Sequence, residues 1–512
     1  MINLHTTNSL MALSQKMFGE KIDEEAFLKR ISERYNQYGS TLLLFIASSG
    51  RIPTMAEWQL LKAIETDNQF QLLKEFFSHT FAERYVEIQV IKGNFCDVTA
   101  LQHVKQISGI QLVASRIYGQ LRARFSFREI HYHERFQIIT LLSSSSVTKH
   151  IVGNHSPKSP RVKIHRILLA GAYAIYRELK FSYPKLAHII RKIWKPNFRN
   201  LEKVSSNANH NNLVAILVDV NFVSCTSIFE RNMMDELEIF IDCNFVNFIP
   251  LVHDLLPIIT PRFFPTESAG LNLQYYSLVS KAKRVYSVSE KVADDLRSFF
   301  GFLSNNNGPE VHVFNLFGII ADVIPEAPEF EDMNNVISER YFLCISTLEP
   351  RKNHLVLLAA LYPLFLKYTD LKLVLIGGYG WDNNDLMSYL SETKFPDRVV
   401  VLRNISETDK YDLIGRALAT IYPSQFEGFG MPILESLLSG TPTLYHESEP
   451  MSGFNNFPNS YPLDMSLIEP LTRHCERLIS IHSFAHKQEQ ALSFEGIRDE
   501  EEYYKYIRHL LY

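Results

Sequence analysis

The sequence lacks several signatures that define common functional classes. Its five cysteines are scattered without a CxxC pair, which argues against a zinc site or a disulfide framework and favours a reducing compartment. It contains no GxxxxGK[ST] phosphate loop and no DxD triplet, and no His/Cys cluster has metal-ligand spacing. These absences argue against a P-loop nucleoside triphosphatase, and we expect that the protein needs no metal ion or other cofactor.

Long apolar runs are also missing. No run reaches the roughly 20 residues that span a bilayer. Near the N-terminus Lys16 and acidic residues stand where a signal peptide has an apolar core, so we expect no secretion signal. The net charge of -4 provides no general attraction to nucleic acid. We therefore expect a cytoplasmic protein, or one that is peripheral at the inner face of the membrane.

The chain is long enough for two or three globular domains, with 512 residues, 46% of them hydrophobic. Strands that alternate with helices predict an α/β fold with two doubly wound domains, at 131–325 and 340–490. Right-handed crossovers require parallel strands in such domains. Residues 1–130 have helical apolar spacing and are predicted to form a mostly helical extension, and residues 491–512 a C-terminal helix.

Each domain has its own set of predicted strands. In the first domain they cover 213–220, 248–252, 284–288 and 311–314. In the second they cover 341–345, 371–376, 399–402, 419–422 and 443–445.

Two polar segments precede these strands. The run Ser143–Ser146 could line a ligand site or could be a plain surface loop. Residues 161–203 contain eleven Lys and Arg against the two acids Glu178 and Glu202, with an apolar stripe beside them. This pattern indicates either a basic amphipathic helix on an anionic membrane surface or a packed helix with a solvated basic face.

A glycine-bearing turn is the centre of the second domain. The apolar residues 417–422 lead as a buried strand into Gly428 and Gly430, and Pro432 stands in the first turn of the helix that follows. A glycine-rich turn at a helix N-terminus presents unpaired N–H groups and the positive end of the helix dipole. The stretch therefore suits a phosphate group.

Charged residues near this turn extend the prediction. Glu427 at the rim of the loop and Glu435 inside the helix suit a ligand that carries hydroxyls beside its phosphate. Arg351 and Lys352 follow the strand 341–345 and combine a planar fork with a point charge, which suits a diphosphate. A solvated basic turn is the alternative, but the shared domain with Glu427 favours a nucleotide-sugar site.

A histidine–aspartate pair follows the strand 248–252 of the first domain. Residues at the carboxyl ends of parallel strands face the ligand crevice of an open α/β sheet. His253 can donate through one ring nitrogen, while Asp254 fixes its orientation or tautomer. A purely structural histidine is the alternative.

These motifs together resemble retaining glycosyltransferases of family 4. The resemblance covers residues 213–450 and rests on EPRKN at 349–353, on the E-x7-E pair Glu427/Glu435 and on His253-Asp254. It implies the GT-B fold, in which two Rossmann-like domains face each other across a cleft. Two departures are that the first domain has no glycine-bearing loop near its start and that residues 136–213 match poorly.

The resemblance also implies roles for the candidate residues. Arg351 and Lys352 would hold the diphosphate, Glu427 would contact the transferred sugar, and Glu435 would bind the ribose hydroxyls. His253 would lie beside the transferred sugar with Asp254 in support. Backbone N–H groups for the donor would come from Gly428, Phe429 and Gly430.

The expected reaction is the retaining transfer of a hexose from a nucleotide-diphosphate sugar to a glycan or lipid-linked glycan. The EPRKN motif resembles mannosyl- and rhamnosyltransferases of bacterial polysaccharide assembly, so GDP-mannose is the first choice of donor. The alternatives are a sugar-nucleotide 2-epimerase of the same architecture and a catalytically inactive glycan-binding protein. No nucleic acid partner is expected.

Overall fold

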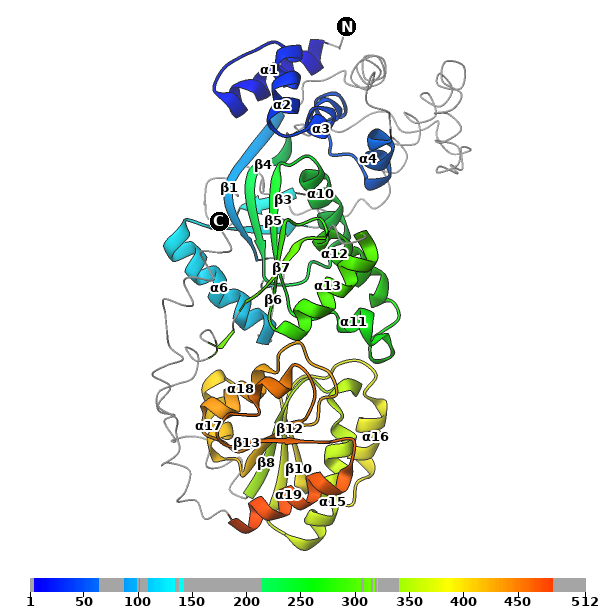
Figure 1. Ribbon diagram of the computed structural model, residues 1–512, viewed down its shortest axis with the longest axis vertical. Helices are drawn as coiled ribbons and strands as arrows, with labels where there is room; N and C mark the ends of the chain where they lie inside the picture. Colours follow the sequence, from blue (N-terminus) through cyan, green and yellow to red (C-terminus); the bar gives the residue numbers. More distant parts are fainter. Residues whose placement is uncertain are drawn as a thin grey trace, which may run out of the picture. The chain divides into compact units, whose positions relative to one another are not determined.

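The computed structural model describes residues 4–63, 87–98, 101, 109–133, 138–141, 213–304, 308–314, 316–317, 320 and 340–481 (Figure 1). The chain divides into two compact units. The first comprises Met1–Gly93, Tyr132–Val220 and Asp235–Val246, and the second Asn94–His131, Asn221–Met234 and Asn247–Tyr512. The serine run 143–146, the basic segment 161–203 and the predicted C-terminal helix 491–512 lie outside the described residues.

Four helices begin the chain: α1 (Leu4–Phe18), α2 (Glu24–Arg34), α3 (Gln37–Ser49) and α4 (Met55–Lys62). In α2, Phe27, Leu28 and Ile31 recur at helical spacing and are buried. In α3 every residue from Gly39 to Ser48 is buried, so neighbouring structure surrounds this helix. The predicted helical character of the N-terminal region is confirmed, although α3 was not predicted as a separate helix.

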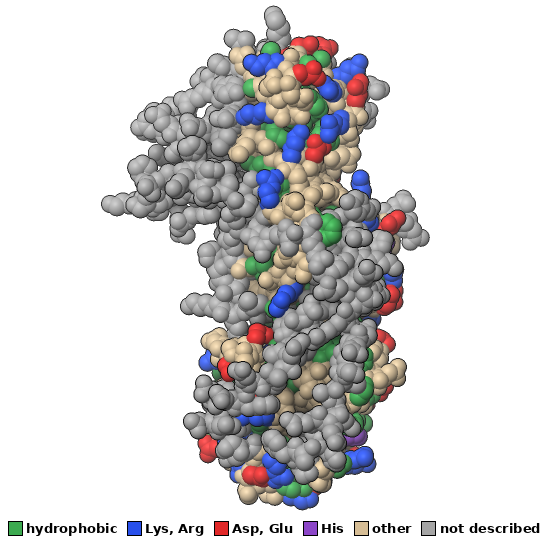
Figure 2. Space-filling model, turned by 90° about the vertical axis from the view of Figure 1, so that its left-hand side faces the viewer, with side chains coloured by type: hydrophobic (Ala, Val, Ile, Leu, Met, Phe, Trp, Pro, Cys, Tyr) green, Lys and Arg blue, Asp and Glu red, His purple; other side chains and the backbone are tan. Residues whose placement is uncertain are grey.

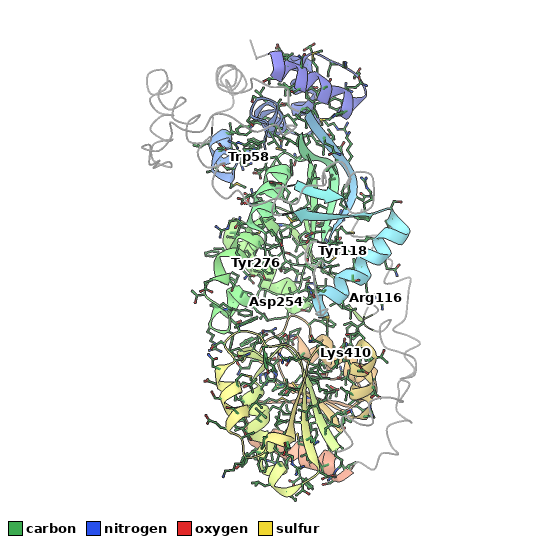
Figure 3. All side chains as sticks on the ribbon, turned by 180° about the vertical axis from the view of Figure 1, so that it is seen from behind. Trp58, Arg116, Tyr118, Asp254, Tyr276 and Lys410 are labelled. Carbon is green, nitrogen blue, oxygen red and sulfur yellow. The ribbon has the colours of Figure 1, made fainter. Side chains whose placement is uncertain are left out.

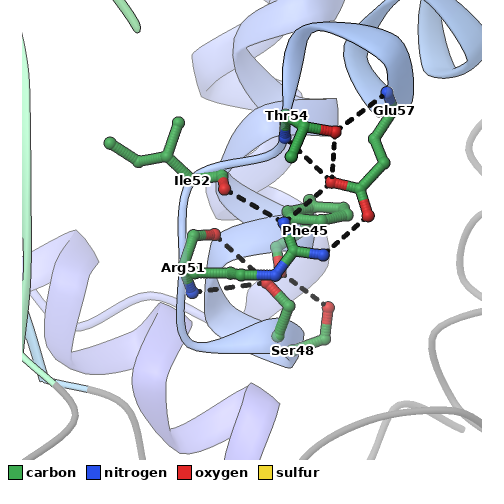
Figure 4. Close-up of polar contacts among 7 residues, drawn as sticks. Phe45, Ser48, Arg51, Ile52, Thr54 and Glu57 are labelled. Carbon is green, nitrogen blue, oxygen red and sulfur yellow. Dashed lines mark hydrogen bonds and ion pairs between the residues drawn. The ribbon is translucent and has the colours of Figure 1, made fainter. Parts of the chain in front are cut away.

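Polar contacts define the start of α4 (Figure 4). Thr54 and Glu57 form a capping box, in which each side chain accepts a hydrogen bond from the other residue's backbone N–H. Arg51 clamps the same carboxylate through two hydrogen bonds of 2.8 and 2.6 Å. Trp58 and Lys62 of α4 both donate to Asp242, which ties α4 to the rest of the first unit.

Seven strands form one sheet in the order β3-β2-β1-β4-β5-β6-β7. Their bounds are β1 (Glu87–Asp97), β2 (Arg128–His133), β3 (Ile138–Leu141), β4 (Leu213–Ser224), β5 (Val246–Val252), β6 (Arg284–Ser287) and β7 (Glu310–Val313). The helical segments between them are α6 (Gly109–Phe125), α10 (Arg231–Asp242), α11 (Leu256–Ile259), η4 (Pro261–Phe263), α12 (Ser268–Val279) and α13 (Glu290–Ser304). All four strands predicted for 131–325 are present, and β5, β6 and β7 pair in parallel.

Strand β1 corrects the helical prediction for residues 1–130. It pairs in parallel with β2, with Phe95 opposite Arg128, and therefore belongs to the sheet. The strand-bearing part of the chain thus begins before residue 131. Gly93 has a φ of 115° inside the strand. A glycine of this conformation interrupts the regular alternation of side chains, which explains why no strand pattern was recognised.

Six strands form the second sheet in the order β10-β9-β8-β11-β12-β13, and every neighbouring pair is parallel. Their bounds are β8 (Arg340–Ile345), β9 (Leu371–Ile376), β10 (Val399–Leu402), β11 (Ala419–Tyr422), β12 (Thr443–His446) and β13 (Ser460–Leu463). The helices are α15 (His354–Lys367), α16 (Asn384–Glu392), α17 (Glu407–Arg416), α18 (Met431–Leu438) and α19 (Ile468–Ile481). Short 3-10 turns are η6 (Pro350–Lys352), η7 (Pro396–Arg398) and η8 (Met451–Phe454).

Both faces of this second sheet are covered by helices (Figure 1). Leu373 and Leu375 of β9 pack with α15 and α19 on one face, while Val374 and Ile376 pack with α17 on the other. Alternate residues of a strand point to opposite faces, so burial on both sides explains the continuous apolar runs in the sequence. The chain therefore contains two parallel α/β sheets preceded by helices, as predicted.

Surface charge, cysteine burial and helix hydrophobicity can each be compared with the features noted in the sequence. On the face drawn in Figure 2, basic and acidic side chains of the described residues are interspersed over the N-terminal helices. All five cysteines are free and buried. Within the described ranges, no helix has both the length and the apolar character to cross a membrane.

Candidate functional site

The glycine-bearing turn between β11 and α18 has the local structure predicted for it. Gly430 has a φ of 95°, which glycine adopts without strain. Pro432 lies in the first turn of α18, where its missing N–H costs nothing. Ile433, Leu434 and Leu437 are buried and hold the helix on the sheet. The start of α18 is therefore fixed, and a helix start of this kind can bind an anion.

Arg351 and Lys352 lie in η6, between the end of β8 and the start of α15. Lys352 is only 8% exposed, which rules out the solvated basic turn considered as the alternative. The carbonyl of Arg351 accepts a hydrogen bond of 2.9 Å from the N–H of Gln425. The basic doublet is thus tied directly to the loop that precedes α18.

Glu427 binds both basic side chains. Arg351 Nη1 lies 3.1 Å from Glu427 Oε2 and 2.8 Å from the carbonyl oxygen of Phe426, and Lys352 Nζ donates to Glu427 Oε1. Burial alone would raise the pKa of Glu427, but the charges of Lys352 and Arg351 lower it to about 2. Glu427 is therefore ionised at neutral pH, and the three side chains form one charged cluster.

A second carboxylate completes this cluster. Glu349 Oε1 lies 2.6 Å from Arg351 Nε, and Glu349 is only 4% exposed. Burial raises the pKa of Glu349, against the effect of the two cations. Two cations are thus matched by two carboxylates in a poorly solvated place. A diphosphate that binds here would compete with these carboxylates for Arg351 and Lys352.

His253 follows β5, and its ring is held by a backbone group. Its Nε2 lies 2.8 Å from the carbonyl oxygen of Cys225. A carbonyl can only accept, so Nε2 carries the hydrogen and Nδ1 keeps its lone pair. Burial lowers the pKa of His253 to about 4, so the ring is neutral at pH 7. His253 thus uses its donor inside the protein and can offer an acceptor to a ligand.

The predicted partnership of Asp254 with His253 is wrong. Asp254 Oδ1 accepts a hydrogen bond of 3.0 Å from the N–H of Leu256, the first residue of α11. Its carbonyl accepts a bond of 2.6 Å from the hydroxyl of Tyr276 (Figure 3). The error arose because adjacency in sequence suggested a side-chain pair, whereas the tautomer of His253 is determined by the strand-end carbonyl of Cys225.

The glycine loop and the end of β5 approach each other closely. A Cβ placed on Gly428 would lie 1.9 Å from the carbonyl oxygen of His253 and 3.1 Å from Cβ of Asp254. The hydroxyl of Ser289 donates to the carbonyl of Gly428 at 2.6 Å and also accepts from the N–H of Val292 at the start of α13. The structure therefore brings together His253, Asp254 and Gly428, which are far apart in sequence.

Glu435 lies on α18 and is buried. Its Oε1 accepts hydrogen bonds from Lys410 Nζ at 3.0 Å and from the hydroxyl of Tyr411 at 3.4 Å. Burial raises the pKa of Glu435, and the charge of Lys410 opposes this rise. The ring of Phe429 packs against Phe454 with a centroid distance of 5.7 Å. Phe429 therefore uses its side chain for packing, which leaves its backbone for a ligand.

Sequence reasoning missed three residues that support this site. Cys225 contributes only a backbone carbonyl, Ser289 links the glycine loop to α13, and Lys410 pairs with Glu435. Backbone partners have no signature of residue type. Lys410 occupies an ordinary position within a helix, and only the fold reveals its buried partner. Among the described side chains, no group of three His, Cys, Asp or Glu could hold a metal ion.

Comparison with known proteins gives a family for part of the chain. Residues 328–455 match the family model described as "Glycosyl transferases group 1", so this segment carries a domain of that family. It contains the basic doublet, the glycine loop and both glutamates of the E-x7-E pair.

Curated relatives match a limited part of the chain. It is similar to the serotype-specific mannosyltransferase WbdA of Escherichia coli, with 28% identity over 211 residues, 38% of this chain and 25% of that protein. It is also similar to O-antigen chain mannosyltransferase B of Escherichia coli, with 26% identity over 199 residues, 38% of this chain and 51% of that protein. The chain therefore spans between a quarter and about half of the length of these relatives.

A solved structure aligns over more of the chain. The sucrose-phosphate synthase of Thermosynechococcus elongatus aligns with a TM-score of 0.49 and 11% identity, over 82% of this chain and 99% of that one.

Proposed function

We propose that the chain is a retaining glycosyltransferase that moves a hexose from a nucleotide-diphosphate sugar to a glycan or lipid-linked glycan. The observation that carries the proposal is the cluster of Arg351, Lys352 and Glu427 beside the glycine-bearing start of α18. The group 1 glycosyltransferase domain at 328–455 supports the reaction class. GDP-mannose is the proposed donor, because the matched relatives are mannosyltransferases.

The proposed chemistry follows from where charge develops. Cleavage of the glycosyl–phosphate bond leaves positive charge on the sugar and negative charge on the diphosphate. Arg351 and Lys352 would stabilise the diphosphate together with the backbone N–H groups at the start of α18. Glu427 would contact the transferred sugar beside these cations. Both cations are already in place, and the diphosphate would bind them in competition with Glu427 and Glu349.

The remaining residues would orient the substrates. His253 would accept a hydrogen bond from a sugar hydroxyl through Nδ1, because its Nε2 hydrogen is used by Cys225. The acceptor hydroxyl would attack on the face that the diphosphate leaves, so the anomeric configuration is retained. Its oxygen would bond to the anomeric carbon, and its proton would pass to the departing diphosphate. Exclusion of water would prevent hydrolysis of the donor.

A donor screen tests the proposal. Purified protein is heated with GDP-mannose and with UDP-, dTDP- and ADP-sugars, and the donor should raise the apparent Tm because a ligand that binds only the folded state stabilises it. A glycan acceptor should then take up the sugar with retention, as read by NMR of the product linkage. Conversion of the sugar nucleotide without acceptor would favour the epimerase. Donor binding without hydrolysis or transfer would favour an inactive glycan-binding protein.

Tyr118→Phe tests the support of His253. The hydroxyl of Tyr118 on α6 accepts a hydrogen bond of 2.8 Å from the N–H of Cys225, whose carbonyl holds His253 (Figure 3). Loss of a buried acceptor costs about 1–3 kcal/mol of unfolding free energy. A misoriented His253 should also lower kcat about tenfold at unchanged donor KM, because small misplacements slow catalysis strongly. Denaturant unfolding and steady-state kinetics measure the two effects.

Tyr445→Phe is the matched control for this prediction. Tyr445 lies on β12, and its hydroxyl is bonded to Asn455 and to Ser460 of β13 rather than to Cys225. This variant should lose stability without a change in kcat. Equal kcat values for the two variants would show that Tyr118 has no role in orienting His253.

A further inference from the structure

A buried lysine lies beside Glu435, the carboxylate for which the proposed function implies a contact with the donor ribose. Lys410 is 9% exposed and lies in the second turn of α17, while Glu435 is 6% exposed and lies on α18. Lys410 Nζ is 3.0 Å from Glu435 Oε1 and 2.7 Å from Glu407 Oε2. Lys410 therefore bridges a buried carboxylate and a more exposed one.

This arrangement limits the orientation of Glu435. The hydrogen bonds from Lys410 and from the hydroxyl of Tyr411 both end on Oε1. Neither of these two hydrogen bonds ends on Oε2. A carboxylate held through one oxygen has a defined direction for the lone pairs of the other. Oε2 can therefore accept hydrogen bonds from the hydroxyls of a ligand.

Burial makes Lys410 necessary for this role. An ionised carboxylate removed from water needs a charged or hydrogen-bonded partner, and loss of one partner from a buried pair is strongly unfavourable. Lys410 provides the positive charge directly at Glu435. The exposed Glu407 holds the ammonium from the other side, so Lys410 stays in place when Oε2 is engaged by a ligand.

We infer that Lys410 is a positioning residue for the nucleotide donor: it holds Oε1 of Glu435 so that Oε2 is presented to the two ribose hydroxyls. This inference rests on the proposed function, since it assumes that a nucleotide binds at the start of α18. Lys410 does not itself contact the donor in this arrangement. It acts through the direction and the charge of Glu435.

Several charged or titratable groups surround Glu435. Lys410, Tyr411 and Glu407 face it from α17. Burial, together with the charge of Glu435, raises the pKa of Tyr422 on β11. Burial and the charge of Glu435 raise the pKa of Tyr411, and the charge of Arg116 on α6 lowers it (Figure 3). Burial raises the pKa of Glu435 and Lys410 lowers it. Binding through ionised Glu435 is therefore lost as the pH falls, and loss of Lys410 moves that limit to higher pH.

The test compares Lys410→Met and Lys410→Arg with the wild-type chain by calorimetry. GDP is the first probe, followed by UDP and ADP, and each is paired with its 2′,3′-dideoxy analogue. For the ribose nucleotide, Lys410→Met should weaken binding about 10- to 100-fold, as expected when one partner of a buried charge pair is removed. Lys410→Arg should restore most of the affinity. For the dideoxy analogue, wild type and Lys410→Met should bind alike.

Two further measurements complete the design. Binding is repeated from pH 5 to pH 8, and the acidic limit should lie at least about one pH unit higher in Lys410→Met, because its carboxylate has lost a neighbouring charge. Lys367→Met is the control, since Lys367 forms an exposed ion pair with Glu476. It should leave binding unchanged.

The outcomes separate the inference from the proposed function. If the wild-type chain binds none of the three nucleotides and no sugar nucleotide of the donor screen, the proposed function is overturned. If it binds one of them and Lys410→Met binds that nucleotide with equal affinity, the inference is wrong and the function stands. An equal loss for the dideoxy analogue would also overturn the inference. If Lys410→Met fails to fold, Lys410→Gln takes its place, because glutamine removes the positive charge but keeps a hydrogen-bond donor. A loss of affinity confined to the ribose nucleotide then supports the inference, and equal affinity for wild type and Lys410→Gln overturns it.

Discussion

Replacement of Glu427 by glutamine is expected to reduce sugar transfer by at least about 100-fold, the loss typical of removing one preorganised electrostatic group. Glutamine keeps the size of the side chain but removes the charge that lies between Arg351 and Lys352. The contact with the transferred sugar is then no longer made by a carboxylate. The two cations remain available to a diphosphate, so nucleotide affinity should change much less than kcat. Calorimetry measures the nucleotide affinity, and a transfer assay measures kcat.

Glu476→Gln is the matched control for Glu427→Gln. Glu476 pairs with Lys367 on the surface of α19 and has an exposed side chain. This variant should transfer sugar at the wild-type rate, because exposed ion pairs contribute little. Thermal unfolding of both variants would establish that they are folded. Near-normal turnover in folded Glu427→Gln would refute the proposed role of the charged cluster.

Gly428→Ala is expected to reduce sugar transfer as strongly as Glu427→Gln, but for a steric reason. The added Cβ would lie 1.9 Å from the carbonyl oxygen of His253. The added Cβ is fixed directly to the main chain and its partner is a main-chain carbonyl, so no side-chain rotation can relieve the collision. The loop and the end of β5 must separate by an ångström or more. A misplacement of this size costs about 100-fold in rate, which steady-state kinetics would measure.

Gly415→Ala controls for the substitution itself. A Cβ at Gly415 within α17 meets nothing within 4 Å. Alanine in a helix interior is about 0.5–1 kcal/mol more favourable than glycine. Gly415→Ala should therefore be fully active and slightly more stable. Full activity of Gly428→Ala would show that the loop can leave His253 without consequence for the reaction.

Much of the second sheet was predictable from the sequence. The predicted strand ranges 371–376, 399–402 and 419–422 coincide with β9, β10 and β11. Strands buried on both faces carry unbroken apolar runs, which are a strong local signal. The glycine turn and the basic doublet follow such strands, so their positions at the strand ends were predictable as well.

The supporting contacts of the site were not predictable in the same way. The carbonyl of Cys225 holds His253 across 28 residues of sequence, and Lys410 meets Glu435 across 25. Such pairs depend on which strand ends become neighbours, and a single sequence does not carry this information. Apart from the support of His253 by Asp254, the roles assigned to the site residues stay predictions, and so do the boundaries of the domains.

The contact with Ser289 allows the glycine loop to separate from α13 at a small cost in free energy. The Ser289 hydroxyl donates its single hydrogen to Gly428, while its lone pairs serve the first turn of α13. If the loop withdraws, the hydroxyl loses one net hydrogen bond of about 0.5–1.5 kcal/mol, and the helix cap is retained. The loop could then move away and return while α13 stays intact, because the first turn of α13 keeps its hydrogen bond to Ser289.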